Sequence, residues 1–379
     1  MARQLLIGVA TTVVPCDASG KTVSRFFERL ALLAREHGAR LILFHPAGID
    51  FARGRVNGYQ LLDDMAARWV RKTERLPDAI YENVYVHLVV KGLTRPLRQG
   101  AKTHGIPLFN PVIFGKWSMH RFVLRHPECG ILVPETRRLE SADTARDVAE
   151  RHGGAAYVKP IGGYGGRGVL RVRKDGRSWR IDCDRYGEGH RGLHQILDDG
   201  AFAKFMKASA RRAPHIVQQQ IPLIQLPGKR KVDFRVVVQR DGEGEWRLVG
   251  IVPKVTASDG VVTNLVAGGN RGNWDNIVAE LGERGQNLKL QALERAGLAL
   301  ARKLSALYPT LGILGYDMGL DEKGRVWLIE VNPKPARSLL DLEMRRRSAK
   351  FSVAFCTYLA RKKVEGQKIG GSPLLREHI

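Results

Sequence analysis

Apolar and polar positions follow helical and strand spacing from the start of the chain. The pattern predicts a β-strand over residues 5–14, an amphipathic helix over 22–37 and a second strand over 40–45. This βαβ unit, with a further strand around residues 78–81, predicts an N-terminal α/β domain over residues 1–108. No glycine-rich phosphate loop follows the first strand, where Pro15-Cys16-Asp17 stands instead, so a dinucleotide site is not expected there.

The rest of the chain mixes helices with strands. Ser141 caps a predicted helix that ends at residues 152–154, and a strand over 155–158 leads into a glycine-rich segment. Further strands are predicted over 216–220, 234–239 and 246–252, with helices over 288–307 and 349–363. We therefore predict an α+β arrangement with antiparallel sheets, divided into residues 109–220 and 221–379.

The clearest alternation predicts a β-hairpin. Residues 312–320 and 325–332 form its strands, and Asp321-Glu322-Lys323-Gly324 forms its turn. This register places Asp317 opposite Glu330. Asn332 shares the face of Glu330, because side chains alternate along a strand.

Composition limits the class of protein. A chain of 379 residues with 44% hydrophobic and 26% charged residues is typical of a soluble protein with two or three domains. The four cysteines have no paired spacing, which argues against a disulfide framework or a zinc site. No stretch reaches the length of a transmembrane helix, so we expect a cytoplasmic protein.

The formal net charge of +24 is high and should attract polyanions. The basic residues are nevertheless spread out, with only short clusters such as Arg345-Arg346-Arg347. There is no basic tail and no interleaving of basic with aromatic residues. A dedicated nucleic-acid module is therefore less favoured than a solvated basic surface.

The hairpin residues carry the strongest chemical signal. Two carboxylates and an amide oxygen that face each other among apolar residues would repel unless a cation lay between them. Hard oxygen ligands without nearby His or Cys suit Mg²⁺, which also keeps water and substrate phosphates as ligands. We predict that Asp317, Glu330 and Asn332 bind magnesium.

The glycine-rich segment is the second signal. Five glycines let the backbone approach an anion and point its N–H groups at phosphate oxygens. A strand over 169–172 follows, so the segment is predicted to be a hairpin lid rather than a P-loop. Lys159, at the end of the preceding strand, makes nucleotide phosphate binding the favoured reading over a flexible surface turn; the glycines are Gly162, Gly163, Gly165, Gly166 and Gly168.

Other polar positions have two interpretations each. Lys116, among apolar residues, is either a second phosphate contact or a surface lysine. Gln218 and Gln219, near Gln225, suit adenine and ribose hydroxyls, but a polar strand edge would look the same. Arg235 either faces the site or forms an ion pair with Asp233.

Lys254 and Asn264 extend the polar material of the same sheet. With Arg235 they are the candidate catalytic residues. The sequence offers no Ser-His-Asp or Cys-His arrangement, and no covalent nucleophile is needed.

In this order the elements resemble the ATP-grasp superfamily: an early lysine, a strand lysine before a glycine-rich hairpin, a hinge strand, a strand arginine and Asp…Glu-x-Asn. The resemblance covers roughly residues 110–332, and its most specific part is Glu330-Val331-Asn332-Pro333. Several stretches look like the endospore coat-associated YheC/YheD branch, namely Gly115-Lys116-Trp117, Leu132-Val133-Pro134-Glu135-Thr136, Tyr157-Val158-Lys159-Pro160, Asp233-Phe234-Arg235 and Thr263-Asn264-Leu265.

The resemblance implies a fold in which two α+β subdomains sandwich ATP. Lys116 and Lys159 would bind its phosphates under the glycine hairpin. Gln218, Gln219 and Ile221 would meet adenine, and Gln225 would meet the ribose. Two Mg²⁺ ions would bind at the hairpin, with Glu330 bridging them. Gly115 departs from the pattern of many relatives, which carry an acidic residue before the early lysine.

The implied activity is that of a carboxylate–amine ligase that acts through an acyl phosphate. Its partners would be small-molecule or peptide carboxylates and amines, with polyanionic acceptors favoured by the charge, and the branch implies a spore-coat association. Two alternatives remain open: a phosphotransferase on an anionic acceptor, and a coat-associated structural protein that binds ATP without turnover.

Overall fold

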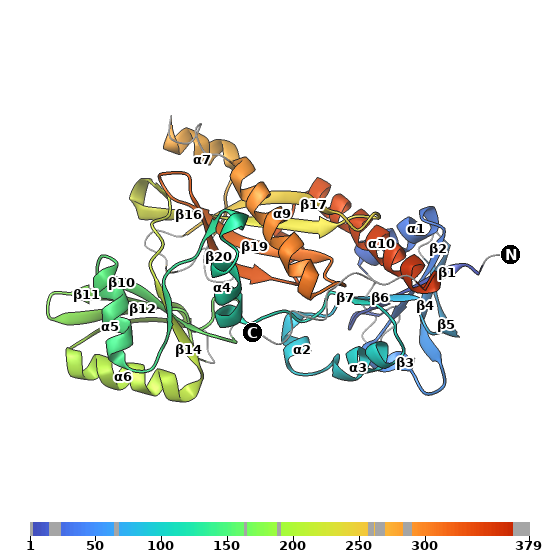
Figure 1. The fold of residues 1–379 in the computed structure, drawn as a ribbon, viewed down its shortest axis with the longest axis horizontal. Coiled ribbons are helices and arrows are strands. Elements are labelled where there is room, and N and C mark those ends of the chain that lie inside the picture. Colours follow the sequence, from blue (N-terminus) through green and yellow to red (C-terminus); the bar gives the residue numbers. More distant parts are fainter. Residues whose placement is uncertain are drawn as a thin grey trace.

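A computed structural model describes residues 3–14, 24–63, 68–162, 165–187, 191–256, 261, 270–282 and 290–366. Within these residues the chain forms three β-sheets of seven, six and seven strands. Figure 1 shows the first sheet at one end, the second at the other and the third between them. No helix among the described residues is long and apolar enough to cross a membrane.

The first sheet confirms the predicted βαβ start, because β1 pairs in parallel with both β2 and β6. The β4–β5 hairpin was not predicted. The order of the strands is β3-β4-β2-β1-β6-β7, with β5 paired to β4. The elements are β1 (Leu5–Ala10), α1 (Arg25–Glu36), β2 (Ala39–Phe44), η1 (Pro46–Gly48), β3 (Ile49–Asp50), β4 (Arg55–Asp63), β5 (Arg68–Arg75), β6 (Ala79–Glu82), α2 (Val86–Val90), α3 (Arg95–Thr103) and β7 (Leu108–Phe109).

The second sheet is antiparallel, in the order β13-β12-β11-β10-β14-β9. Its core includes Val158, Val172 and Phe202, so α5 and α6 cover one face. The elements are β9 (Thr136–Arg138), α5 (Ala142–Arg151), β10 (Ala155–Pro160), β11 (Leu170–Asp175), β12 (Ser178–Tyr186), β13 (Arg191–Leu197), α6 (Asp199–Arg212) and β14 (His215–Gln219).

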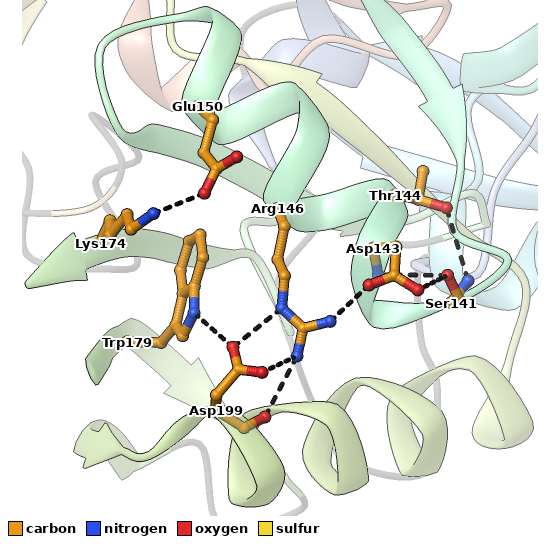
Figure 2. Close-up of polar contacts among 8 residues, drawn as sticks. All are labelled: Ser141, Asp143, Thr144, Arg146, Glu150, Lys174, Trp179 and Asp199. Atoms are coloured by element: carbon orange, nitrogen blue, oxygen red, sulfur yellow. Dashed lines mark hydrogen bonds and ion pairs between the residues drawn. The ribbon is translucent and has the colours of Figure 1, made fainter. Parts of the chain in front are cut away.

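Polar contacts fix the two helices on this sheet (Figure 2). Ser141 caps α5 as predicted, and its side chain accepts a hydrogen bond from the backbone of Asp143. Arg146 of α5 donates to Asp143 and to Asp199 in the first turn of α6. The indole of Trp179 donates to the same Asp199, which joins both helices to β12.

The third sheet has the order β18-β17-β16-β19-β20-β8, with β15 paired to β16. Its core includes Phe234, Leu300 and Tyr316, so α9 packs on one face. The elements are α4 (Lys116–Leu124), η2 (Pro127–Cys129), β8 (Ile131–Leu132), β15 (Gln225–Leu226), η3 (Pro227–Lys229), β16 (Arg230–Arg240), β17 (Trp246–Val255), β18 (Asn270–Arg271), α7 (Trp274–Leu281), α9 (Leu290–Leu307), β19 (Ile313–Leu320), β20 (Val326–Asn332), η5 (Arg337–Leu339) and α10 (Leu342–Val364).

The first and third sheets share a core. Val353 and Phe355 of α10 cluster with Ile7 of β1, and Phe351 of the same helix packs against a cluster that contains Val237 of β16. Figure 1 shows α10 between α1 and the third sheet. The α+β class is confirmed, while the domain boundaries at residues 108 and 220 stay a prediction.

Asn110 adds a polar link between the same two parts. Its buried side chain accepts hydrogen bonds from the backbone of Gly312 and Ile313, at 2.7 and 3.1 Å. It donates to the carbonyl oxygens of Ile313 and Pro333. The segment that leaves the first sheet is thereby tied to both ends of the β19–β20 hairpin.

Candidate functional site

A cavity of about 200 Å³ lies where α2, α4, β14 and β20 converge. Five residues that the sequence singled out line it, and they come from four separate parts of the chain. They are Lys116, Gly162, Gln218, Glu330 and Asn332.

The β19–β20 hairpin has the predicted Asp317–Glu330 pair, but a β-bulge between Asp317 and Met318 shifts the pairing next to the turn by one residue. Asp317 pairs with Glu330, and Asn332 lies two positions further along β20, opposite Gly315. On the other side of β19, Arg235 of β16 is the partner of Asp317. The strand pairing therefore brings Arg235, Asp317 and Glu330 into one row across the third sheet.

Four buried charged residues form what we call the inner network: Asp233, Arg235, Lys254 and Asp317. Arg235 donates to both oxygens of Asp317, at 2.7 and 3.1 Å. The Lys254 ammonium lies 2.9 Å from Asp233 and 3.0 Å from Asp317. The ion pair of Arg235 is thus with Asp317 rather than with Asp233, while its role at the site stays a prediction.

Asp317 and Lys254 favour the ionised forms of each other. Burial alone would raise the pKa of Asp317, but Lys254 and Arg235 together lower it to about 2. Burial opposes the charge on Lys254, yet Asp233 and Asp317 raise its pKa. Lys254 is therefore a charged partner that holds Asp317, and a protonated lysine cannot act as a base.

Three half-buried residues form what we call the outer group: Lys116, Lys159 and Glu330. Lys116, the first residue of α4, lies 3.2 Å from Glu330. Burial is the main cause that lowers the pKa of Lys159 to about 8, and Lys116 adds to it while Glu330 opposes it. The three residues carry two positive charges and one negative charge, an arrangement that favours an anion.

The glycine-rich segment joins β10 to β11 in an antiparallel hairpin, as predicted. Gly165 and Gly168 have φ angles of +66°, a conformation that side chains other than glycine rarely adopt. Arg185 holds the described part of the loop, since its guanidinium donates to the Gly165 carbonyl and its own carbonyl accepts from the Gly168 amide. Gly163 lies outside the described residues.

The residues expected at adenine and ribose are placed differently from one another. Gln218 is buried at the cavity and donates to the hydroxyl of Thr136. The side-chain oxygen of Gln219 accepts from the backbone of Glu135. Ile221 and Gln225 are not among the residues that line the cavity, and Gln225 is exposed on β15. Their roles stay predictions, and Asn264 lies outside the described residues.

The candidate magnesium ligands among the described residues are the oxygen donors of the β19–β20 hairpin. No group of three or more His, Cys, Asp or Glu side chains within the described part of the chain is arranged for a metal ion. The predicted set instead combines two carboxylates with the amide of Asn332. Arg235 and Lys254 contact the Asp317 carboxylate and fix its orientation, while Glu330 is 27% exposed and open to further ligands.

The apolar wall of the cavity was not predicted from the sequence, and it includes Phe114, Met119, Val133 and Leu328. Nor was His120, a buried residue whose Nδ1 has no hydrogen-bond partner among the described residues. His120 stands four residues after Lys116, and that spacing puts both side chains on one face of a helix. This spacing is the feature of the sequence that could have identified His120 as a candidate site residue.

Comparisons with known proteins agree with this geometry. A family model described as "YheC/D like ATP-grasp" matches residues 105–359. The endospore coat-associated protein YheD of Bacillus subtilis (strain 168) is 24% identical over 375 residues, which cover 95% of this chain and 80% of YheD. YheC of the same organism is 23% identical over 342 residues, which cover 87% of this chain and 91% of YheC.

A solved structure has a similar fold. The RiPP-associated ATP-grasp ligase of Chryseobacterium gregarium, in complex with ADP and a leader and core peptide, superposes with a TM-score of 0.51 at 12% identity. The match covers 93% of this chain and 97% of the ligase chain. At this identity the likeness establishes the ATP-grasp fold.

Proposed function

Because this chain belongs to the YheC/D-like ATP-grasp family, we propose that it is an ADP-forming ligase that joins a carboxylate to an amine. An oxygen of the acceptor carboxylate attacks the γ-phosphorus of ATP, and the bond to the β-phosphate oxygen breaks to release ADP. The amine then attacks the acyl phosphate, inorganic phosphate leaves, and the amine loses a proton as the amide forms.

The observation that carries the proposal is the convergence of Lys116 and Glu330 with Gln218 and Asn332 on one cavity. Lys159 is not among the lining residues, but its ammonium interacts electrostatically with both Lys116 and Glu330. Lys116 and Lys159 would neutralise phosphate oxygens, and the lid amides would add further donors. Arg235 is fixed before any ligand arrives, so it could stabilise charge on the transferring group without reorganisation.

Asp317, Glu330 and Asn332 would hold one or two Mg²⁺ ions. When bound, the metal would neutralise the phosphate charge that develops during transfer. The protein's own contribution is to hold the three oxygen donors in register across two strands.

The test is a screen of carboxylates and amines for MgATP-dependent ADP and phosphate release, with products identified by mass spectrometry. The proposal predicts release that requires both acceptors and yields an amide. Hydrolysis that is indifferent to every acceptor would contradict ligation.

Two other functions have specific support. The net charge of +24 favours a phosphotransferase that acts on a polyanion, which a phosphorylated product would identify. The names of YheD and YheC favour association with the endospore coat. If MgATP raises the melting temperature but no acceptor stimulates ATP turnover, the protein would be an ATP-binding coat component.

A further inference from the structure

The carboxyl edge of the first sheet has the geometry of a ligand site. β1 lies between β2 and β6 and is parallel to both, so the strand order reverses at β1. In α/β sheets, ligands bind outside the carboxyl ends of the strands at such a switch point. Here the two strand ends meet, because the amide of Asn83 donates to the carbonyl of Ala10 at 2.9 Å.

The loop that follows Asn332 brings cations to this edge. The Lys334 ammonium lies 2.7 Å from the carboxylate of Glu82 and donates to its backbone oxygen at 2.6 Å. Arg337 donates to the side-chain oxygen of Asn83 at 3.2 Å. Its guanidinium carbon lies 3.5 Å from the centre of the Phe26 ring. The same short loop therefore connects the cavity to the switch point.

Positive charge exceeds negative charge at this edge. Glu82 is buried, and its carboxylate is shared between Arg98 and Lys334. No carboxylate among the described residues lies within ion-pair distance of Arg337. Among the described residues at this edge, three cations and one carboxylate leave a net charge of +2. Burial lowers the pKa of Lys334 even though Glu82 opposes it, which agrees with incomplete compensation.

This charge pattern selects the chemistry of a ligand. An ammonium group would meet no available carboxylate, since both oxygens of Glu82 already serve cations. An anionic group would gain a charge-assisted contact with Arg337, whose planar guanidinium suits a carboxylate.

On the basis of the proposed function, we propose that the acceptor is a dicarboxylate or an acidic peptide, and that Arg337, with Lys334 beside it, binds its second carboxylate. The reacting carboxylate has to reach the cavity beside Glu330 and Asn332. Arg337 lies five residues beyond Asn332, at the neighbouring edge of the first sheet, so the charge that it binds belongs to another group of the same acceptor.

The experiment compares paired acceptors on three variants of the full chain. Glutarate is paired with butyrate, and triglutamate with trialanine, in assays of amine- and MgATP-dependent ADP release. The variants are Arg337→Gln, Arg337→Lys and Arg346→Gln, the last being a matched loss of charge at an exposed position of α10.

We expect the acidic member of at least one pair to be the better acceptor. Arg337→Gln should raise its KM by about 10- to 100-fold, since hydrogen bonds to charged groups contribute about 1.5–3 kcal/mol. Arg337→Lys should recover part of the loss, Arg346→Gln should match the wild type, and the rise in melting temperature with MgATP should persist in all three variants. Equal KM values for Arg337→Gln and Arg346→Gln, or equal use of both members of each pair, would overturn the proposal.

Failure of ligation is distinguishable from failure of this site. If no acceptor stimulates ADP release, calorimetric titration of triglutamate into the MgADP-loaded protein decides the question alone. Binding that Arg337→Gln weakens and Arg346→Gln leaves intact would support the site. Absence of binding to the wild type would overturn it.

Discussion

The inner network and the outer group meet where β20 pairs with β19 but differ in charge balance and in exposure. The inner network has two cations and two carboxylates, and each of its side chains is at most 10% exposed. The outer group has two cations and one carboxylate, and Lys116 and Glu330 remain 22% and 27% exposed. The comparison indicates that the inner network satisfies itself and holds the hairpin, while the outer group has charge left for a ligand.

The largest effect is expected from breaking the inner network. Asp317→Asn leaves Arg235 buried without its carboxylate, which should lower the free energy of unfolding by about 3–5 kcal/mol and abolish turnover. Denaturant unfolding measures the loss. Adding Lys254→Met should make the double variant less destabilised than the sum of the single changes. An unchanged midpoint for Asp317→Asn would refute the role of the network.

The same chemical change in the outer group should affect function instead of stability. Glu330→Gln is expected to lower the rate of ATP turnover by about 100- to 1000-fold, the usual cost of removing a preorganised electrostatic group. Its free energy of unfolding should stay within about 0.5 kcal/mol of the wild type. Glu322→Gln, an exposed change in the turn of the same hairpin, is the control and should leave both quantities unaltered.

Titration of Lys159 should reveal the charge of the outer group. Its pKa is lowered to about 8, so the ammonium that would bind phosphate is lost as the pH rises through that value. In the free enzyme kcat/KM for ATP should fall about tenfold per pH unit above pH 8. Lys159→Arg should move this fall to higher pH, because a guanidinium stays charged. A flat profile to pH 10 would contradict the assignment.

The smallest effect is expected for Mg²⁺ added alone, compared with MgATP, on the melting temperature. The inner network and outer group together hold four cations and three carboxylates, a net charge of +1. Mg²⁺ alone should therefore raise the melting temperature by less than 1 °C in a thermal-shift assay, on the order of the assay's error, whereas MgATP should raise it by several degrees. An equal rise with Mg²⁺ alone would indicate that the hairpin binds the bare ion.

The sequence predicted the hairpin and its Asp317–Glu330 pair, because a turn signal between two alternating segments specifies a hairpin. It did not predict the β-bulge between Asp317 and Met318, which offsets a one-residue shift of the strand pairing next to the turn. The partner of Arg235 could not be predicted in the same way. Asp233 lies on the same strand, whereas Asp317 becomes adjacent only when β16 pairs with β19. That pairing joins segments more than seventy residues apart, and the local pattern does not specify it.

Physical reasons also explain why some elements were not predicted from the sequence. The strand β5 carries exposed Arg71 and Lys72, so its alternation is weak. The helix α10 begins at Leu342, seven residues before the predicted start, because Asp341 caps it ahead of an arginine cluster that resembles a solvated loop. The apolar cavity wall consists of ordinary helix and strand residues such as Met119 and Leu328, whose convergence is a property of the tertiary structure.

The hydrogen bonds of Asn110 have a mechanical consequence. They fasten the exit of the first sheet to Gly312, Ile313 and Pro333, while α10 packs on both neighbouring sheets. Those two parts are thus expected to behave as a single block that keeps the candidate metal donors and the Arg337 edge in constant separation. Any closure over a nucleotide should then come from rotation of the six-stranded sheet. This rotation would move the glycine hairpin towards the block formed by the first and third sheets.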